Sequence, residues 1–214
     1  MFEWLRSFTD LIYRRKCYCC SSARENTLLC SKCYDELVFC NTLPSKFVCG
    51  VDVYCAGIYN KNLQKLIRAL KYHKKQELAY YLAKFTYEYW EQLGLSGEFE
   101  IVPVPLHPNR LKKRKYNQVD LIANEFAKLT GYSLNNELIH RSKDTLPQYK
   151  LSRIERLDNL KGAFTVDKSK YNKGKKLLLI DDISTTGSTF ETMVNELKFN
   201  GINNIVCLAV ATPF

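Results

Sequence analysis

The chain has 214 residues, a formal net charge of +10 and 46% hydrophobic residues, which suits one ordinary globular domain plus a small module. No apolar run approaches the roughly 18 residues needed to span a bilayer. The first residues, with an early acid and no continuous apolar core, do not resemble a secretory signal. We therefore expect a cytoplasmic protein, and its excess of positive charge favours a polyanionic partner.

The nine cysteines are concentrated near the N-terminus, after a short amphipathic helix that the spacing of apolar residues predicts over 2–12. They include two Cys-x-x-Cys pairs: Cys17 with Cys20, and Cys30 with Cys33. Each pair fits a tight turn that directs two thiolates at one ion, and four thiolates complete a tetrahedral zinc site. In a reducing compartment such a cluster indicates a metal rather than disulfides, so we predict a structural Zn²⁺. Cys19 stays open as a substitute ligand for Cys17 or Cys20.

After a linker expected over 41–45, strand and helix patterns alternate. Strands are predicted over 51–59, 99–104, 177–180 and 205–210, and helices over 63–72, 77–93, 117–129 and 188–199. The continuous apolar runs 177–180 and 205–210 are typical of strands that are buried on both faces of a sheet. The alternation predicts an α/β domain with a parallel sheet over 46–214, preceded by the zinc module over 1–45.

The positive charge is gathered in two stretches that contain no acid: 61–75, with six Lys or Arg, and 110–115, with five. Such clustering favours nucleic acid or a phosphorylated small molecule as the partner. Two solvated faces are the alternative interpretation.

A loop of small hydroxylic residues links the strand at 177–180 to the helix at 188–199. Backbone N–H groups at a helix start, together with the helix dipole, favour a bound phosphate. The candidate phosphate-binding residues are Thr185, Thr186, Gly187, Ser188 and Thr189. Asp181 and Asp182 precede them and would repel phosphate, so they suit sugar hydroxyls, directly or through Mg²⁺. A helix cap without a ligand is the alternative for this loop.

The segment 177–189 resembles the phosphoribosyl diphosphate (PRPP) motif of type I phosphoribosyltransferases. Together with the cysteine pairs and the segments 70–72, 102–118 and 141–164, it resembles the ComF family of competence proteins, specifically the ComFC type, over nearly the whole chain. The resemblance implies a type I phosphoribosyltransferase fold. It also implies that Asp181 and Asp182 form the catalytic, ribose-facing pair and that the loop from Thr185 to Thr189 holds the 5-phosphate of PRPP.

The resemblance further implies a role in natural transformation, in which the protein binds single-stranded DNA during import with a helicase-like partner. In this fold the loop after the first core strand contacts pyrophosphate, so Arg110, Lys113 and Arg114 are expected to contact pyrophosphate or DNA. The segment 141–164 falls where the family has a mobile lid. At one position the chain departs from the family, because Lys115 replaces a glycine. If that glycine requires a positive φ, the loop here should differ slightly.

Three functions follow from these observations. The first is a competence protein that binds single-stranded DNA and PRPP. The second is an active phosphoribosyltransferase, in which Mg²⁺-PRPP loses pyrophosphate and an unidentified base attacks C1 of the ribose. The third is a non-catalytic PRPP sensor that docks a helicase. A salvage enzyme requires a base pocket, and the terminal stretch offers only Phe214 for one, which favours the first function.

Overall fold

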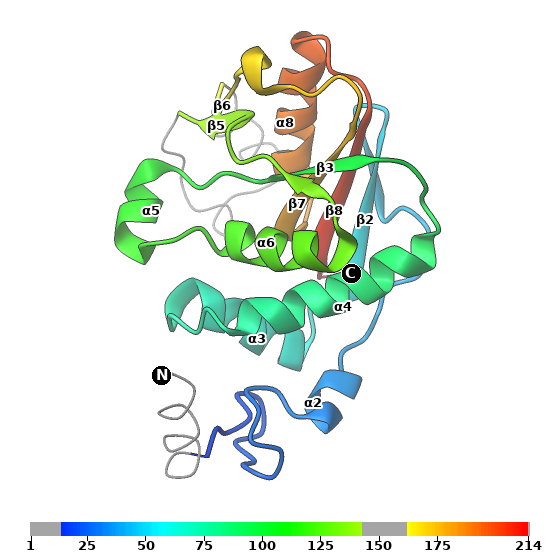
Figure 1. The fold of residues 1–214 in the computed structure, drawn as a ribbon. Helices are drawn as coiled ribbons and strands as arrows, with labels where there is room; N and C mark the ends of the chain where they lie inside the picture. Colours follow the sequence, from blue (N-terminus) through cyan, green and yellow to red (C-terminus); the bar gives the residue numbers. More distant parts are fainter. Residues whose placement is uncertain (1–13, 143–161, 214) are drawn as a thin grey trace, which may run out of the picture.

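The computed structural model describes residues 14–142 and 162–213 (Figure 1). The helix predicted over 2–12, most of the predicted lid at 141–164, and Phe214 lie outside the described residues. The elements in chain order are α2 (Ser31–Asp35), β1 (Lys46–Val48), β2 (Val51–Ile58), α3 (Lys61–Tyr72), α4 (Leu78–Leu93), β3 (Phe99–Pro103), α5 (Pro108–Arg114), α6 (Gln118–Thr130), β4 (Ser133–Leu134), β5 (Ile139–Arg141), β6 (Phe164–Val166), the 3-10 helix η2 (Lys168–Lys170), β7 (Lys176–Ile183), α8 (Ser188–Phe199) and β8 (Ile205–Thr212).

All eight strands and helices predicted from the pattern are present, as β2, α3, α4, β3, α6, β7, α8 and β8. The stretch 103–118, which follows the first core strand, was expected to be a loop. This prediction was wrong, because the stretch contains the helix α5. Apolar periodicity could not reveal α5, because none of its residues is buried. Its start is stabilised locally: Pro108 occupies the first turn, and Nδ1 of His107 accepts a hydrogen bond from the Asn109 N–H at 3.2 Å.

Six strands form the main sheet in the order β1-β2-β8-β7-β3-β4, and every pairing except β1 with β2 is parallel. From β3 the chain continues to β4, toward one edge of the sheet. From β7 it continues to β8, toward the opposite edge. Adjacent parallel strands whose connections diverge in this way open a crevice outside their carboxyl ends, where α/β proteins bind ligands. The fold therefore places a binding crevice beyond Pro103 of β3 and Ile183 of β7.

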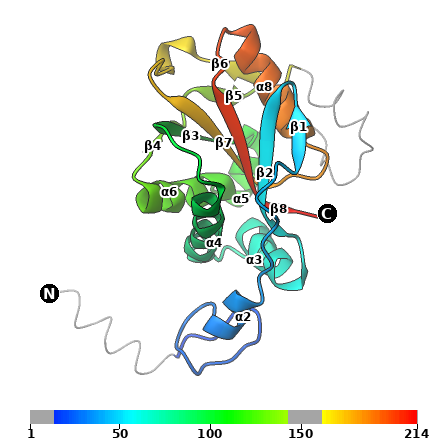
Figure 2. The same cartoon turned by 90° about the vertical axis from the view of Figure 1, so that its right-hand side faces the viewer.

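Helices cover both faces of the sheet (Figures 1 and 2). One core packs α3, α4 and α6 against alternate residues of the strands, such as Leu178 and Ile180 of β7. The other packs α8 against the residues between them, such as Leu177 and Leu179. Because successive strand residues point to opposite faces, a strand buried on both sides reads as a continuous apolar run, as predicted for 177–180.

The cysteine module lies against α3 and α4, at one end of the molecule (Figure 1). The hydroxyl of Tyr34 donates to Oε2 of Glu88 at 2.8 Å, and Nζ of Lys65 donates to the carbonyl of Cys19 at 2.8 Å. The boundary at residue 45 stays a prediction. Among the described helices, none combines the length and the apolar character that crossing a membrane requires.

Candidate functional site

The four predicted zinc ligands meet at one point of the structure. The sulfur atoms of Cys17, Cys20, Cys30 and Cys33 all lie within 4.8 Å of one another. The Cys20 and Cys30 sulfurs are 3.7 Å apart, close to the ~3.8 Å edge of a tetrahedron with Zn–S bonds of ~2.3 Å. The cluster could therefore hold a zinc ion, and Cys19 is not part of it.

Cys17 and Cys19 differ in their surroundings. Burial opposes ionisation of Cys17, but hydrogen bonds from the backbone of Cys30, Cys20 and Cys19 outweigh it and lower the Cys17 pKa to about 7. Burial raises the pKa of the Cys19 thiol to about 11. Since the Cys17 sulfur belongs to the cluster and the Cys19 sulfur does not, the structure favours Cys17 over Cys19 as a ligand.

A cavity of about 660 Å³ opens at the crevice that the sheet topology defines. The predicted residues that line it come from two parts of the chain. Asp181 and Asp182 belong to the end of β7, Thr185 and Thr189 follow that strand, and Arg110, Lys113 and Arg114 belong to α5. The last turn of α3, with Lys71 and Tyr72, closes another side. Two acidic residues thus lie at the floor of a cavity whose walls are strongly basic.

Asp182 is fully engaged within the protein. One carboxylate oxygen lies 2.8 Å from Nζ of Lys71, and the other accepts a hydrogen bond from Nε2 of Gln118 at 2.7 Å. Asp182 and Gln118 are only 4% and 5% exposed. Strand geometry explains the pairing, because Asp182 has the parity of Ile180 and points to the face covered by α3 and α6. Asp182 therefore anchors two helices to β7.

Asp181 differs from Asp182 in its direction and in its pKa. It points to the opposite face, and its Oδ1 accepts a hydrogen bond from the Asp182 N–H at 2.8 Å. Burial at the cavity floor, and then the neighbouring carboxylate of Asp182, raise the pKa of Asp181 to about 7. Asp181 is thus the member of the pair that lines the cavity with a pKa raised toward neutrality.

Two of the predicted phosphate-binding side chains line this cavity, and the others do not. Thr185 and Thr189 line it. Thr186 lines a separate hollow of about 420 Å³ beside β1. Ser188 is buried, and its hydroxyl lies 2.7 Å from the Thr186 hydroxyl. Gly187 has φ +83°, and a β-carbon there would lie 3.1 Å from a methyl group of Val48. The glycine is therefore required for the turn into α8 and for close packing against β1.

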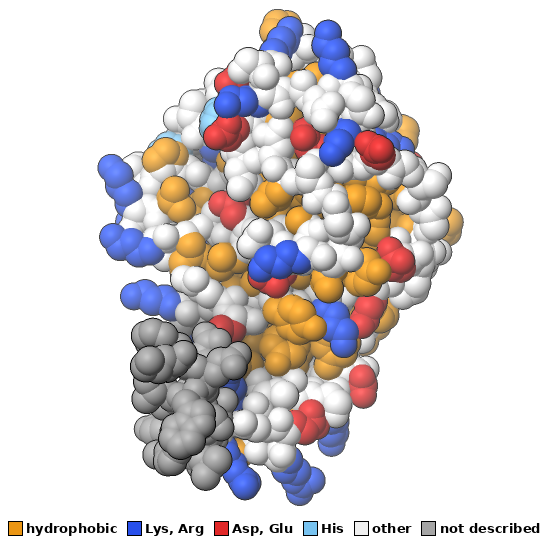
Figure 3. All heavy atoms as spheres, in the orientation of Figure 1, with side chains coloured by type: hydrophobic (Ala, Val, Ile, Leu, Met, Phe, Trp, Pro, Cys, Tyr) orange, Lys and Arg blue, Asp and Glu red, His pale blue; other side chains and the backbone are white. Residues whose placement is uncertain are grey.

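The two basic runs, far apart in the sequence, converge on the cavity. The hydroxyl of Tyr116 donates to the carbonyl of Leu70, which ties the segment after α5 to the end of α3. The Arg114 guanidinium lies 5.3 Å from the ring centre of Tyr72, and its Nη1 donates to Oε1 of Gln118 at 2.6 Å. Arg114 thereby connects the basic surface to the clamp around Asp182. Figure 3 shows Lys and Arg side chains projecting along the margin where α5 lies.

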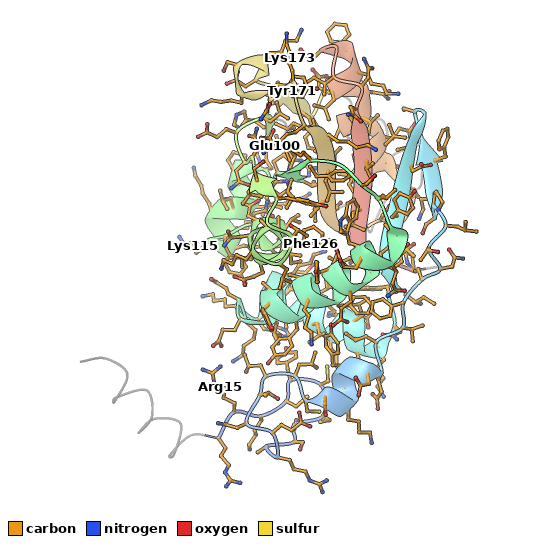
Figure 4. The ribbon with its side chains drawn as sticks, turned by 45° about the vertical axis from the view of Figure 1, so that its right-hand side comes forward. Arg15, Glu100, Lys115, Phe126, Tyr171 and Lys173 are labelled. Atoms are coloured by element: carbon orange, nitrogen blue, oxygen red, sulfur yellow. The ribbon has the colours of Figure 1, made fainter. Side chains whose placement is uncertain are left out.

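Sequence reasoning did not assign roles to Lys71, Gln118 or Arg141, although all three line the cavity. All three stand inside segments that carry the family resemblance, which is the signal that could have found them. Lys115, in place of the family's glycine, keeps φ at +72°. The lysine thus takes the left-handed conformation, and its side chain is exposed (Figure 4).

The predicted fold class is confirmed: the chain is an α/β protein with a mostly parallel sheet, helices on both faces and an N-terminal four-cysteine cluster. Similar solved structures are adenine phosphoribosyltransferases. That of Thermoanaerobacter pseudethanolicus has a TM-score of 0.39 and 13% identity over 65% of this chain and 82% of its own. That of Trypanosoma brucei has a TM-score of 0.40 and 10% identity over 85% and 78%.

Sequence comparison identifies the relatives. Competence protein F of Haemophilus influenzae is 28% identical over 88% of this chain and 86% of its own length. The DNA utilization protein YhgH of Escherichia coli K12 is 31% identical over 67% and 64%, and competence protein ComFC of Streptococcus pneumoniae is 28% identical over 84% and 74%. No family model matches the sequence. The chain belongs, as a distant member, to the ComF/YhgH family of competence and DNA utilization proteins.

Proposed function

We propose that the protein acts in DNA uptake by binding a ribose 5-phosphate compound such as PRPP in the cavity and single-stranded DNA on the basic surface beside it. The observation that carries this proposal is the convergence of both basic runs on the cavity that holds Asp181 and Asp182. The names of the relatives, which concern competence and DNA utilization, support the same conclusion.

In the cavity, Asp181 accepts hydrogen bonds from the ribose hydroxyls or holds them through Mg²⁺, because Asp182 is already paired. The hydroxyls of Thr185 and Thr189 and the start of α8 bind the 5-phosphate. Arg110 faces the pyrophosphate, whose charge a fixed cation stabilises. Mg²⁺, when bound, would neutralise part of the diphosphate charge.

The DNA lies on the cations around the cavity. Lys74 and Lys113 line the rim of the cavity and are exposed. Neither forms an ion pair with another residue in the described part of the chain. Such cations bind the phosphates of any strand, so the affinity should depend little on sequence and fall steeply with salt. A helicase-like protein would be the partner in the reducing cytoplasm, where a four-thiolate metal site is stable.

An active phosphoribosyltransferase is the second candidate. The observation in its favour is the pairing of Asp181, whose pKa lies near neutrality, with arginines on the same cavity. Pyrophosphate release from Mg²⁺-PRPP, measured across a panel of bases with and without single-stranded DNA, separates turnover from binding alone.

The ligand assignment is tested by calorimetry with PRPP and Mg²⁺. We expect Asp181→Asn to weaken PRPP binding by at least tenfold, because the sugar hydroxyls lose a charged acceptor. Lys173→Glu, at the far end of the molecule (Figure 4), serves as the control. Equal PRPP affinity in the wild type and in Asp181→Asn would refute the assignment.

The DNA assignment is tested by the salt dependence of binding to a fluorescent oligo-dT strand. Arg110→Glu/Lys113→Glu should flatten the log–log slope by about 1.4, since each single-strand phosphate contact contributes about 0.7. Arg114 is left intact because it holds Gln118. The matched control, Lys168→Glu/Lys173→Glu, changes the net charge equally on another surface. An unaltered slope in the α5 variant would remove α5 from the DNA site.

A further inference from the structure

The outward face of α3 carries a row of side chains of which only the last, Tyr72, lines the cavity. Lys61, Lys65, Arg68 and Tyr72 follow one another at intervals of four, three and four residues, so they lie on one side of the helix. Lys71, on another side, points to Asp182. The row begins beside the cysteine module, where Lys65 contacts Cys19, and ends at the cavity rim with Tyr72.

The charge on this face is not neutralised within the described parts of the chain. Lys61 and Arg68 are both exposed, and neither forms an ion pair with another described residue. Glu36 accepts a hydrogen bond from Asn62 of α3 at 2.8 Å but forms no ion pair with Lys61 or Arg68 among the described residues, and Glu77 pairs with Arg15 at 3.4 Å.

Three basic side chains elsewhere on the surface have an acidic partner. Lys84, Lys128 and Lys170 each pair with a glutamate, at 3.6, 2.6 and 2.6 Å. A solvated face of an ordinary helix carries such compensating acids. The absence of acids from the whole of α3 therefore indicates that the counter-charge comes from a partner.

Tyr72 adds an exposed aromatic ring to the row of cations. It remains 59% exposed even though the Arg114 guanidinium lies over its ring. An exposed aromatic ring between cations suits a single strand, whose unpaired bases can stack on it, whereas the bases of a duplex are already stacked. The combination of a cationic track and one stacking platform is the arrangement used for single-stranded nucleic acid.

We propose that the outward face of α3 is the track along which single-stranded DNA runs from the cavity rim toward the cysteine module. Tyr72 stacks a base at the rim, and Lys61 and Arg68 contact phosphates along about 10 Å of helix. This inference rests on the proposed DNA-binding function and adds the surface and the direction of the strand. It also gives the cysteine module a role, because the module supports the far end of the track.

The experiment measures binding of a fluorescent oligo-dT strand to the full-length, metal-loaded protein over a range of salt concentrations. Lys61→Glu/Arg68→Glu should weaken binding and make the log–log slope less negative by about 1.4. Lys65 is kept because it holds the module to α3. Lys168→Glu/Lys173→Glu is the matched charge control, and thermal unfolding checks that the variants are folded.

A second arm tests the stacking platform. Tyr72→Ala should reduce single-strand affinity by about five- to a hundredfold, while Tyr72→Phe retains it. Tyr80→Ala is the matched control, since Tyr80 is an exposed tyrosine on α4.

The outcomes separate the two levels of the proposal. If the wild type binds single strands but the α3 and Tyr72 variants bind equally well, the track is wrong and the proposed function stands. If the wild type binds no single strand at low salt, the proposed function itself fails. The assignment to single strands would be overturned if duplex DNA bound as tightly as single strands and Tyr72→Ala left the single-strand affinity unchanged.

Discussion

Asp181 and Asp182 are adjacent, yet the structure gives them opposite states. Strand parity directs Asp182 toward Lys71 and Gln118, where its charge is compensated, and leaves Asp181 at the cavity floor without an equivalent clamp. A pair of like charges in a buried site pushes one pKa upward, and here that residue is Asp181. Asp182 is therefore the anchor, and Asp181 is the acid that we propose to contact the ligand.

Asp181→Asn should raise stability in a pH-dependent way. The folded pKa of about 7 lies above the ordinary value of 3.8, so between these values the folded state holds a proton that the unfolded state has lost. The contribution of Asp181 to stability therefore falls as the pH rises from about 4 to 7. Urea unfolding should show little gain for the variant at pH 4 and a gain of about 1 kcal/mol or more at pH 8. Equal gains at both values would contradict the raised pKa.

Lys71→Met should be strongly destabilising, by about 3–5 kcal/mol, because it leaves the buried Asp182 carboxylate without its cation. Adding Asp182→Asn to Lys71→Met should restore much of the loss. Denaturant unfolding of both single variants and the double variant provides the coupling free energy between the two side chains. Strictly additive effects would show that the pair does not act as a unit.

Lys115→Gly should stabilise the protein by about 0.5–1 kcal/mol, because φ +72° is strained for a lysine and natural for glycine. The gain is reduced by the larger backbone entropy of glycine in the unfolded chain. Lys115→Ala is the control: it removes the charge, keeps the strain and should leave the stability nearly unchanged. Thermal unfolding of the three proteins measures the difference.

At the scale of elements, α3 connects the three parts of the molecule. Its inward apolar face packs in the core with α4, its last turn supplies Lys71 to the cavity, and Lys65 and Asn62 hold the cysteine module. The cysteine module is short, and its buried Leu29 and Leu37 belong to the same core cluster as α3 and α4. Because it is too small for a core of its own, a bound metal should supply much of its order.

Removal of metal should therefore act on the module first. We expect about one zinc ion per chain, lost on treatment with a strong chelator or in Cys30→Ser, with a lower unfolding temperature. Cys19→Ser should keep the zinc content, because its sulfur is not in the cluster. Metal analysis that found no zinc in protein purified without chelator would contradict the assignment.

At the scale of the whole molecule, the fold brings the end of the basic run 61–75, the helix α5 and the loop after β7 together at one cavity. If α5 contacts both pyrophosphate and DNA, the two ligands share cations and should oppose each other. PRPP should then weaken oligo-dT binding, and by linkage DNA should weaken PRPP binding by the same factor. Titrations of each ligand in the presence and absence of the other measure both factors. Ribose 5-phosphate, which lacks the pyrophosphate, should have a smaller effect.

The sequence alone was sufficient for the class of fold and for the metal cluster. Apolar periodicity predicted the eight main elements, because burial on one or both faces leaves a pattern in the chain. Two Cys-x-x-Cys pairs identified the four clustered thiols, because ligands close in sequence need only a local turn to meet. The short helix α5 was missed because it buries nothing.

The tertiary structure decided what lies far apart in sequence. It showed that the end of α3 meets α5 at one cavity, that Lys71 and Gln118 clamp Asp182, and that Asp181 lines the same cavity. Neither the pattern of charges nor the spacing of the acids contains this information. Salt bridges and hydrogen bonds between distant residues depend on helix direction and strand order, and packing of the whole chain sets both.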